Sequence, residues 1–141
     1  MPLSREEREQ FLAEPHVAAL SVAGEEGRGP LSVPVWYQYE PGGDIWVLTG
    51  LGSRKHRLID AAGRFTLMVD RLDPTIRYVS VEGPVTRTSP GTREILREIS
   101  ARYLPAEKVD EYIEFAEKNH GDSIVIHMHP EHWVSSDLGS L

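Results

Sequence analysis

The sequence contains no cysteine, which excludes disulfide bonds, thiolate catalysis and cysteine-based zinc sites. It also contains no apolar run long enough to span a bilayer, and its first ten residues, MPLSREEREQ, are too highly charged for a signal peptide. We therefore expect no membrane association and a cytoplasmic location. Repeats, low-complexity tracts and linkers are absent as well, so the 141 residues are expected to form one domain, 1–141.

Positive charge is scarce in this chain. There are 15 lysine and arginine residues against 22 aspartate and glutamate residues, which gives a formal net charge of -7. General nucleic-acid binding needs a broad basic face to neutralise phosphates, so we expect no nucleic-acid partner. Any anion that this protein binds should therefore be small and held by a local group of side chains.

Runs rich in β-branched and aromatic residues, separated by glycine and proline, indicate strands. We expect six, at residues 17–23, 31–39, 45–49, 65–70, 78–87 and 123–129. Helices are expected after Ser4, Ser53 and Ser89-Pro90, which resemble helix caps, and between Pro105 and Gly121. Six strands joined mostly by short turns predict a mainly β protein with helices (α+β), built as an antiparallel barrel or sandwich.

The run at residues 31–39 is apolar on both of its faces. Val33, Val35 and Tyr37 share one face, whereas Trp36 lies on the other, where exposure of its indole to water would be unfavourable. Strands that are apolar on both faces need cover on both, and in a short chain a second subunit is a natural source of that cover. We therefore expect a homodimer.

The stretch TGLGSRKHRL, residues 49–58, is a compact cationic segment in an acidic protein. If a strand ends at Thr49 and Ser53 begins a helix, then the free N–H groups of the first turn, the Ser53 hydroxyl and the charges of Arg54 and Lys55 can converge on one anion. Phosphate suits such a site because it offers several acceptor oxygens and matching charge. The alternative is a solvated loop whose arginines pair with surface carboxylates.

Two further groups have competing interpretations. In HMHPEHW, residues 127–133, three histidines and Glu131 could bind zinc or iron, but three ligands from so short a span rarely close around a metal, so we expect none. Tryptophans are usually core or interface residues, and this is the interpretation we favour for Trp46.

The order of these segments resembles the flavin-binding split-barrel superfamily named after pyridoxamine 5′-phosphate oxidase. The matching pieces are VPVWY, WVLTGLGSRK with the helix RLIDAAGRF, the paired strands TLMVD and VSVEG, and the tail HPEHW. The chain is most similar to small bacterial members that use flavin mononucleotide (FMN) or the deazaflavin coenzyme F-420. The resemblance implies a six-stranded antiparallel split β-barrel of the FMN-binding type.

The resemblance also implies a cofactor site at a dimer interface. In the family, the loop equivalent to Ser53–Lys55 binds the cofactor phosphate, two strand segments run along its ring, and a residue near the C-terminus reaches the ring from the other subunit. The expected cofactor-binding residues are Val33, Pro34, Val35, Trp36, Leu48, Thr49, Ser53, Arg54, Lys55 and Trp133.

The implied activity is that of an oxidoreductase that transfers hydride between F-420 or FMN and a small organic substrate. The cofactor carries that chemistry, which fits a sequence without an evident acid–base pair. Tyr37, His56 and His132 are conceivable proton donors, but no spacing selects one, so the catalytic residue stays unassigned. The alternative is a non-catalytic protein of the same fold that binds a flavin or another conjugated ligand.

Two features bear on the choice of substrate and cofactor. In the family, pyridoxamine 5′-phosphate oxidase itself binds its substrate phosphate through a C-terminal segment that contains an arginine. This chain has no arginine or lysine after Lys118. We therefore do not expect a true pyridoxamine phosphate oxidase. The acidic tail of F-420 would favour extra cations near the loop, for which Arg57 and Arg77 are available, and this inclines us slightly to the deazaflavin.

Overall fold

The computed structural model describes residues 1–139 of the chain, which form eight strands and four helices. In chain order these are α1 (Arg5–Ala13), β1 (Ala18–Val22), β2 (Leu31–Val35), β3 (Gln38–Tyr39), β4 (Ile45–Gly50), α2 (Arg54–Ala62), β5 (Arg64–Arg71), β6 (Arg77–Pro90), α3 (Arg93–Tyr103), α4 (Ala106–Asn119), β7 (Ser123–Met128) and β8 (His132–Asp137).

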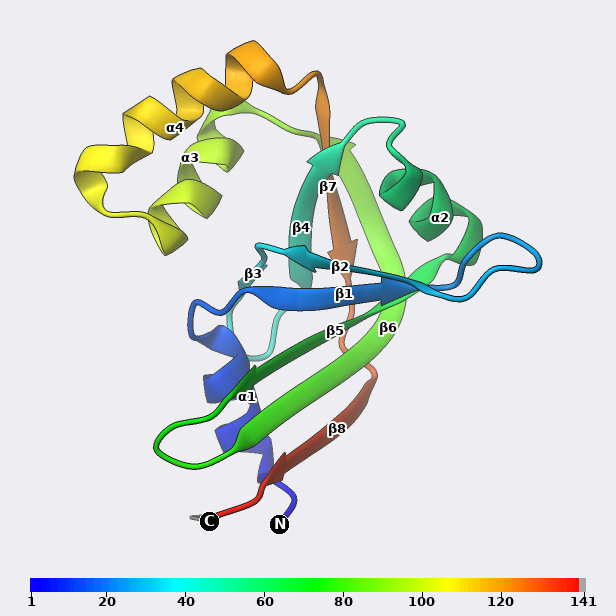
Figure 1. The fold of residues 1–141 in the computed structure, drawn as a ribbon, viewed down its shortest axis with the longest axis vertical. Helices are drawn as coiled ribbons and strands as arrows, with labels where there is room; N and C mark the ends of the chain where they lie inside the picture. Colours follow the sequence, from blue (N-terminus) through cyan, green and yellow to red (C-terminus); the bar gives the residue numbers. More distant parts are fainter. Residues whose placement is uncertain (140–141) are drawn as a thin grey trace.

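The long strand β6 joins the two halves of an antiparallel sheet with the strand order β2-β1-β5-β6-β7-β4-β3. Its first half pairs with β5 and β8, and its second half pairs with β7. The register shifts between Val85 and Arg87, and such a bulge bends and twists a strand. The sheet therefore curls into an incomplete barrel (Figure 1). The predicted α+β antiparallel split barrel is confirmed.

Eight strands take the place of the predicted six, for two reasons. The run at residues 31–39 breaks at Trp36 and Tyr37, because β2 pairs with β1 on one side of the barrel while β3 pairs with β4 on the other. The tail forms β8 on the free edge of β6. The turn that leads into it crosses β6 at Gly83, where a Cβ atom would overlap with the carbonyl oxygen of His129.

The barrel core is built from side chains of strands β1–β7 and of helices α1 and α2. Leu20, Val47, Leu67 and Ile126 are fully buried in it, as alternation along their strands predicts. Helix α1 begins at the predicted cap Ser4, which forms a capping box with Glu7, and it adds Phe11 and Leu12 to the core. No helix within residues 1–139 is long and apolar enough to cross a membrane.

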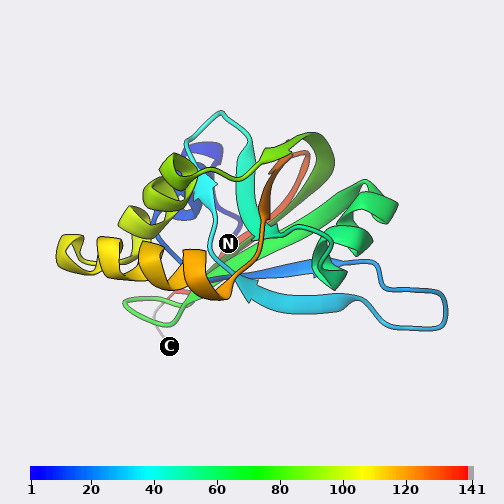
Figure 2. The ribbon, with the colours of Figure 1, turned by 90° about the horizontal axis from the view of Figure 1, so that it is seen from above.

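Helices α3 and α4 form a hairpin that projects from the barrel between β6 and β7 (Figures 1 and 2). Helix α3 is capped by Thr92, because residues 89 and 90 still belong to β6, so the predicted start lies three residues too early. At the neck, the N–H of Gly91 donates to the carbonyl of Ser123 at 2.9 Å.

The hairpin covers Trp36. The indole stacks on Tyr103 with ring centroids 4.8 Å apart and also lies 5.4 Å from the ring of Tyr112. Tyr103 ties the hairpin to the barrel, since its hydroxyl group donates to the carbonyl of His16 at 2.7 Å and accepts from the N–H of Tyr37 at 3.1 Å. From the sequence we expected a second subunit to shield this face from water. At Trp36, the helical hairpin of the same chain shields it.

Candidate functional site

The cationic loop is a strand-to-helix turn, as predicted. Strand β4 ends at Gly50, and α2 begins after its N-cap Ser53, whose Oγ accepts from the N–H of His56 at 3.2 Å. Gly52 has φ +76°, a conformation that favours glycine, and its N–H donates to Nδ1 of His56 at 2.9 Å. These bonds fix the loop, while the hydroxyl proton of Ser53 stays available to a ligand.

Within this loop, Arg54 already has an anionic partner. Its Nε and Nη2 lie 3.1 and 2.8 Å from the two carboxylate oxygens of Glu25, in the turn between β1 and β2. This bidentate bond lowers the pKa of Glu25 to about 2 and raises that of Arg54. The structure thus gives Arg54 the surface carboxylate that the alternative interpretation anticipated. Its contact with a cofactor phosphate stays a prediction.

Lys55 is in the opposite situation. Its side chain is half-buried, no ion pair joins it to a carboxylate within residues 1–139, and burial lowers its pKa. A partly buried charge without a partner is energetically unfavourable, so it gains from binding an anion. Lys55 lines a groove of about 840 Å³ and is therefore the cation that this structure makes available there.

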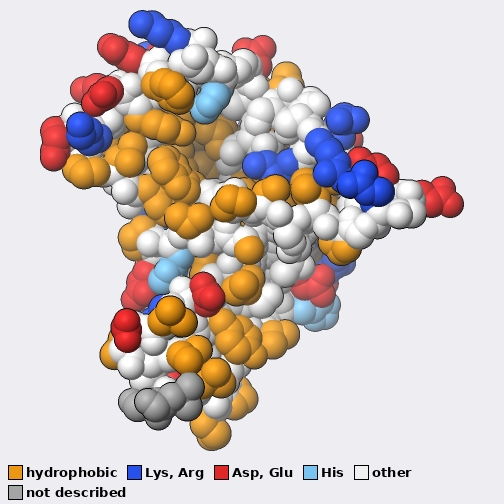
Figure 3. All heavy atoms as spheres, in the orientation of Figure 1, with side chains coloured by type: hydrophobic (Ala, Val, Ile, Leu, Met, Phe, Trp, Pro, Cys, Tyr) orange, Lys and Arg blue, Asp and Glu red, His pale blue; other side chains and the backbone are white. Residues whose placement is uncertain are grey.

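The groove lies between the end of β4 and the helical hairpin. Its lining includes apolar side chains from both sides, namely Leu48, Leu96, Tyr112 and Ala116. Figure 3 shows the hollow, with hydrophobic side chains on the hairpin side and lysine and arginine side chains on the α2 side. An apolar wall facing a cationic end suits a molecule that combines a ring system with an anionic group.

The structure brings together part of the predicted cofactor site. Leu48, Thr49 and Lys55 line the groove, and Ser53 and Arg54 belong to the same loop. Within the hairpin, the groove also contains polar side chains that the sequence did not single out: Thr92, Arg93, Glu117 and His120. Arg93 is ion-paired with Glu117. No local pattern marks these residues, because only the fold places the hairpin beside the loop.

The other predicted residues lie elsewhere in the single chain. Val33 and Pro34, on the edge strand β2, line a separate depression of about 300 Å³, and the side chain of Val35 is buried in the core. Trp133 lies on β8 and lines a depression separate from the groove beside Lys55, with the guanidinium of Arg8 4.6 Å from the centre of its ring. Its approach to a cofactor from a second subunit stays a prediction.

The three conceivable proton donors all have other contacts. Tyr37 is fully buried, donates to the carbonyl of Leu12 at 2.5 Å, and has a pKa raised by burial. His56 caps the loop, and His132 lies 3.1 Å from a carboxylate oxygen of Glu131. None of the three is in the lining of the groove beside Lys55.

The histidines of residues 127–132 do not converge. His127 contacts Arg87, His129 contacts Asp44, and His132 contacts Glu131. Across the part of the chain that the structure describes, no three side chains of histidine, aspartate or glutamate come together in a way that could hold a metal ion.

Solved structures of other proteins share the fold of this chain. Similar solved structures include one named "F420 Reductase" (TM-score 0.71, 22% identity, covering 89% of this chain and 94% of that one). They also include a conserved hypothetical protein from Mycobacterium tuberculosis (TM-score 0.71, 22% identity, covering 96% of this chain and 85% of that one). A third is a FAD-binding protein from Mesorhizobium loti (TM-score 0.62, 18% identity, covering 97% of this chain and 95% of that one). At these identities the likeness concerns the fold.

Sequence comparison gives the family itself. No curated protein matches the chain. A family model described as pyridoxamine 5′-phosphate oxidase, however, matches residues 4–136, which is nearly the whole chain. This protein therefore belongs to the pyridoxamine 5′-phosphate oxidase family.

Proposed function

We propose that this protein is an oxidoreductase that binds a flavin-type cofactor, F-420 or FMN, in the groove beside Lys55. The observation that carries the proposal is the half-buried side chain of Lys55, which has no carboxylate partner within residues 1–139 and lines a groove with an apolar wall. A cofactor with a phosphate group and a conjugated ring matches both ends of that groove.

Each part of the groove then has a physical role. Lys55, the first-turn N–H groups of α2 and the Ser53 hydroxyl bind the phosphate. Leu48 and the apolar side chains of the hairpin hold the ring and exclude water from it. The bound cofactor supplies hydride transfer to or from a small organic substrate. The protein thus acts chiefly by positioning and by shielding the ring.

We favour F-420 over FMN. A similar solved structure is named an F420 reductase, and Arg57 is exposed on α2 beside the cationic loop, where an acidic tail could meet it. Arg77 does not add to this surface, since its Nε lies 2.9 Å from Asp137 beside β8. With no arginine or lysine after Lys118, a substrate other than pyridoxamine phosphate is expected.

We also propose that the active form is a homodimer in which Trp133 of one subunit covers the cofactor of the other. Trp133 is half-buried on β8 and lines a different depression from the groove beside Lys55, so in this arrangement the contact with the ring comes from a second copy. Light scattering gives the subunit number. Trp133→Ala should then weaken cofactor binding, whereas a monomer, or unchanged affinity in this variant, contradicts the arrangement.

The test of the cofactor site is a titration of the purified protein with FMN and, separately, with F-420, followed by ring fluorescence. We expect micromolar or tighter binding of one cofactor and none for Lys55→Glu, because that change places a carboxylate where the phosphate binds. Lys108→Glu, which makes the same charge change at an exposed position of α4, should bind normally. Unchanged affinity in Lys55→Glu would overturn the phosphate assignment.

Turnover separates the oxidoreductase from its alternative, a non-catalytic binder of the same fold. The protein with reduced cofactor bound is mixed with a panel of unsaturated organic acceptors, and reoxidation is followed by absorbance. Reoxidation that depends on both protein and acceptor supports the enzyme. Tight binding with no acceptor-dependent reoxidation indicates the binder.

A further inference from the structure

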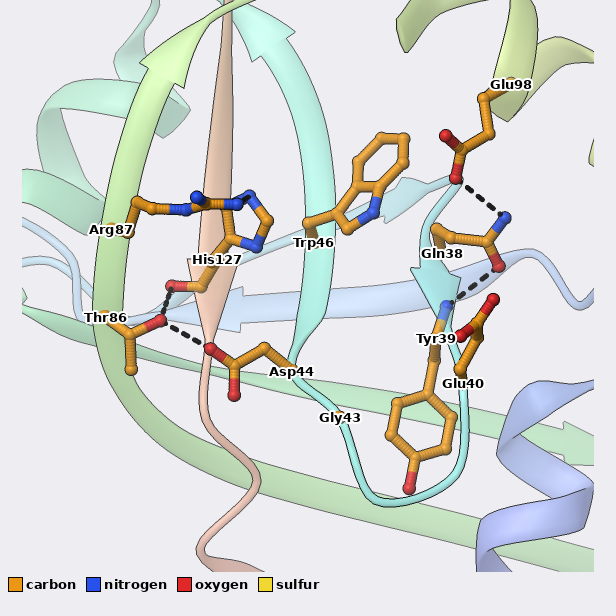
Figure 4. Close-up of a pocket in the computed structure, with 10 residues that line it drawn as sticks. All are labelled: Gln38, Tyr39, Glu40, Gly43, Asp44, Trp46, Thr86, Arg87, Glu98 and His127. Carbon is orange, nitrogen blue, oxygen red and sulfur yellow. Dashed lines mark hydrogen bonds between the residues drawn. The ribbon is translucent and has the colours of Figure 1, made fainter.

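Four polar and aromatic side chains form a row across the outer face of the sheet, one on each of four neighbouring strands. Gln38 of β3 is paired with Trp46 of β4, Trp46 with His127 of β7, and His127 with Arg87 of β6. Since paired strands lie about 4.8 Å apart, the row extends over about 14 Å. The four side chains line a pocket of about 590 Å³ (Figure 4).

One end of this pocket offers hydrogen-bond donors. Nη2 of Arg87 lies 3.1 Å from Nε2 of His127, and because arginine can only donate, Nε2 must accept and the proton of the neutral imidazole sits on Nδ1. Burial and the charge of Arg87 lower the pKa of His127, which favours this neutral form. The guanidinium and the Nδ1–H group are thus both available to an anionic ligand.

The nearby carboxylate does not neutralise Arg87. Asp44 accepts from the hydroxyl of Thr86 at 2.7 Å through one oxygen and contacts Nδ1 of His129 at 3.2 Å through the other. No ion pair joins Arg87 to a carboxylate among residues 1–139, where its hydrogen-bond partner is His127. Arg87 thus has no direct ion-pair partner among these residues, while the carboxylate of Asp44 in the same lining partly offsets the positive charge.

The other end of the pocket is acidic. Glu98 of α3 and Glu40 line it, and neither forms an ion pair with a lysine or arginine among the described residues. Glu98 receives a single long bond, 3.4 Å, from the side-chain amide of Gln38. Figure 4 shows the half-buried indole of Trp46 between the two ends, so a flat surface joins a cationic to an acidic group.

We propose that this pocket binds a planar molecule that carries a carboxylate at one end and an ammonium group at the other. The carboxylate meets Arg87 and His127, the ammonium group meets Glu98 and Glu40, and the ring lies against Trp46. The volume falls within the range usual for small-molecule sites. Neither an apolar molecule nor a simple anion satisfies both ends.

The position of this pocket points to a role. Leu48, which lines the groove beside Lys55, follows Trp46 by two residues on the same face of β4, a distance of about 7 Å along the strand. Helix α3 contributes to both cavities, with Leu96 in the groove and Glu98 in the pocket. If the proposed function is correct, the molecule bound here lies beside the cofactor and is the substrate. The binding itself does not depend on that function.

The probe is 4-(aminomethyl)benzoate, which has a flat ring between a carboxylate and an ammonium group, and the cofactor-free protein is used. The chain has three tryptophans and hence three indole N–H signals in a proton–nitrogen correlation spectrum, with that of Trp46 assigned by Trp46→Phe. We expect the probe to shift the Trp46 signal alone. Benzoate and benzylamine, each with one of the two charges, should bind about tenfold or more weakly.

Matched variants locate the two ends. Arg87→Gln should weaken binding of the probe and of benzoate about tenfold but leave benzylamine unaffected, and Glu98→Gln should do the reverse for the two fragments. Arg28→Gln, on the exposed turn between β1 and β2, should change nothing. Lys55→Glu should also retain probe binding, so the failure of the cofactor site and the failure of this pocket are distinguishable.

Three results would overturn the proposal. The first is a Trp46 signal that millimolar probe does not move. The second is a shift that persists unchanged in both Arg87→Gln and Glu98→Gln, which indicates only nonspecific contact with the indole. The third is a Trp46 signal that moves with protein concentration and not with probe, which identifies the face as a contact between copies of the chain.

Discussion

The guanidinium group of Arg54 binds both carboxylate oxygens of Glu25, at 3.1 and 2.8 Å, and so links the β1–β2 turn to the first turn of α2. The two residues are far apart in sequence, and the pairing occupies a side chain that the family resemblance assigns to a cofactor phosphate. An anion that arrives at the loop therefore competes with a carboxylate for Arg54, whereas Lys55 is free to bind it.

Removal of that competition should strengthen cofactor binding. In Glu25→Gln, Arg54 loses its charged partner and can turn to the phosphate, so we expect the dissociation constant to fall about two- to fivefold, the range of an exposed ion pair. Fluorescence titration measures the change. The same substitution made in an Arg54→Gln background should have no effect, and a gain of equal size there would show that Arg54 is not the cause.

The lowered pKa of Lys55 predicts how cofactor affinity depends on pH. The charged form, which binds phosphate, is present below the pKa of the lysine in the folded protein. Because burial moves that pKa down from the ordinary 10.5, affinity should begin to fall at a lower pH than for an exposed lysine. Dissociation constants measured from pH 7 to 10 test this. Lys55→Arg stays charged throughout, so its affinity should not fall over this range.

Tyr103 should contribute to stability through its hydroxyl group. Tyr103→Phe leaves the buried N–H of Tyr37 and the carbonyl of His16 without this partner, so we expect the free energy of unfolding to drop by about 1–2 kcal/mol. Urea denaturation followed by circular dichroism gives the value. Tyr112→Phe is the matched control, since its ring contacts Trp36 but its hydroxyl forms no hydrogen bond within residues 1–139, and it should unfold like the unmodified protein.

Asp137 should make stability depend on acid pH. The backbone N–H of Gly139, the Thr75 hydroxyl and Arg77 lower its pKa from 3.8 to about 2. Because the pKa of Asp137 is lower in the folded protein than in the unfolded chain, its carboxylate stabilises the fold at pH values above 3.8. This contribution disappears as the pH falls toward 2. Asp137→Asn should therefore melt a few degrees lower at pH 7. The difference from the unmodified protein should shrink between pH 4 and pH 2.

The control for Asp137 is Asp60→Asn, an exposed position on α2, which should not change the melting temperature. If the destabilisation by Asp137→Asn were the same at pH 2 as at pH 7, the loss of charge would not be its cause. The contribution of Asp137 would then lie in packing at the end of β8.

Local sequence signals predicted much of the fold. Ser4 and Ser53 mark helix starts as expected, because the side chain of each accepts a hydrogen bond from a backbone N–H in the first turn of its own helix. Strand β8 was missed because HWVSSD has few apolar residues, and its partner lies 50 or more positions away on β6. Pairing with a free strand edge leaves little trace in composition.

The candidate site likewise has one part that the local sequence predicts and one part that only the fold brings together. The turn from β4 to Ser53 and Lys55 follows from residues that are adjacent in sequence, and so could be predicted. The facing wall comes from residues 91–123, and the bond between Arg54 and Glu25 joins two separate turns. Neither shows a pattern in the sequence, since both depend on how the chain folds back on itself.

The neck at Gly91 and Ser123 has a consequence for how such proteins can diversify. A hydrogen bond joins the two residues, and the segment between them is an insertion that connects β6 and β7, two strands already paired in antiparallel register. Because its two ends are held together, such an insertion can lengthen, shorten or change composition at little entropic cost. Related chains could thus acquire new ligand preferences by exchanging this insertion while the β-sheet and its cationic turn are inherited unchanged.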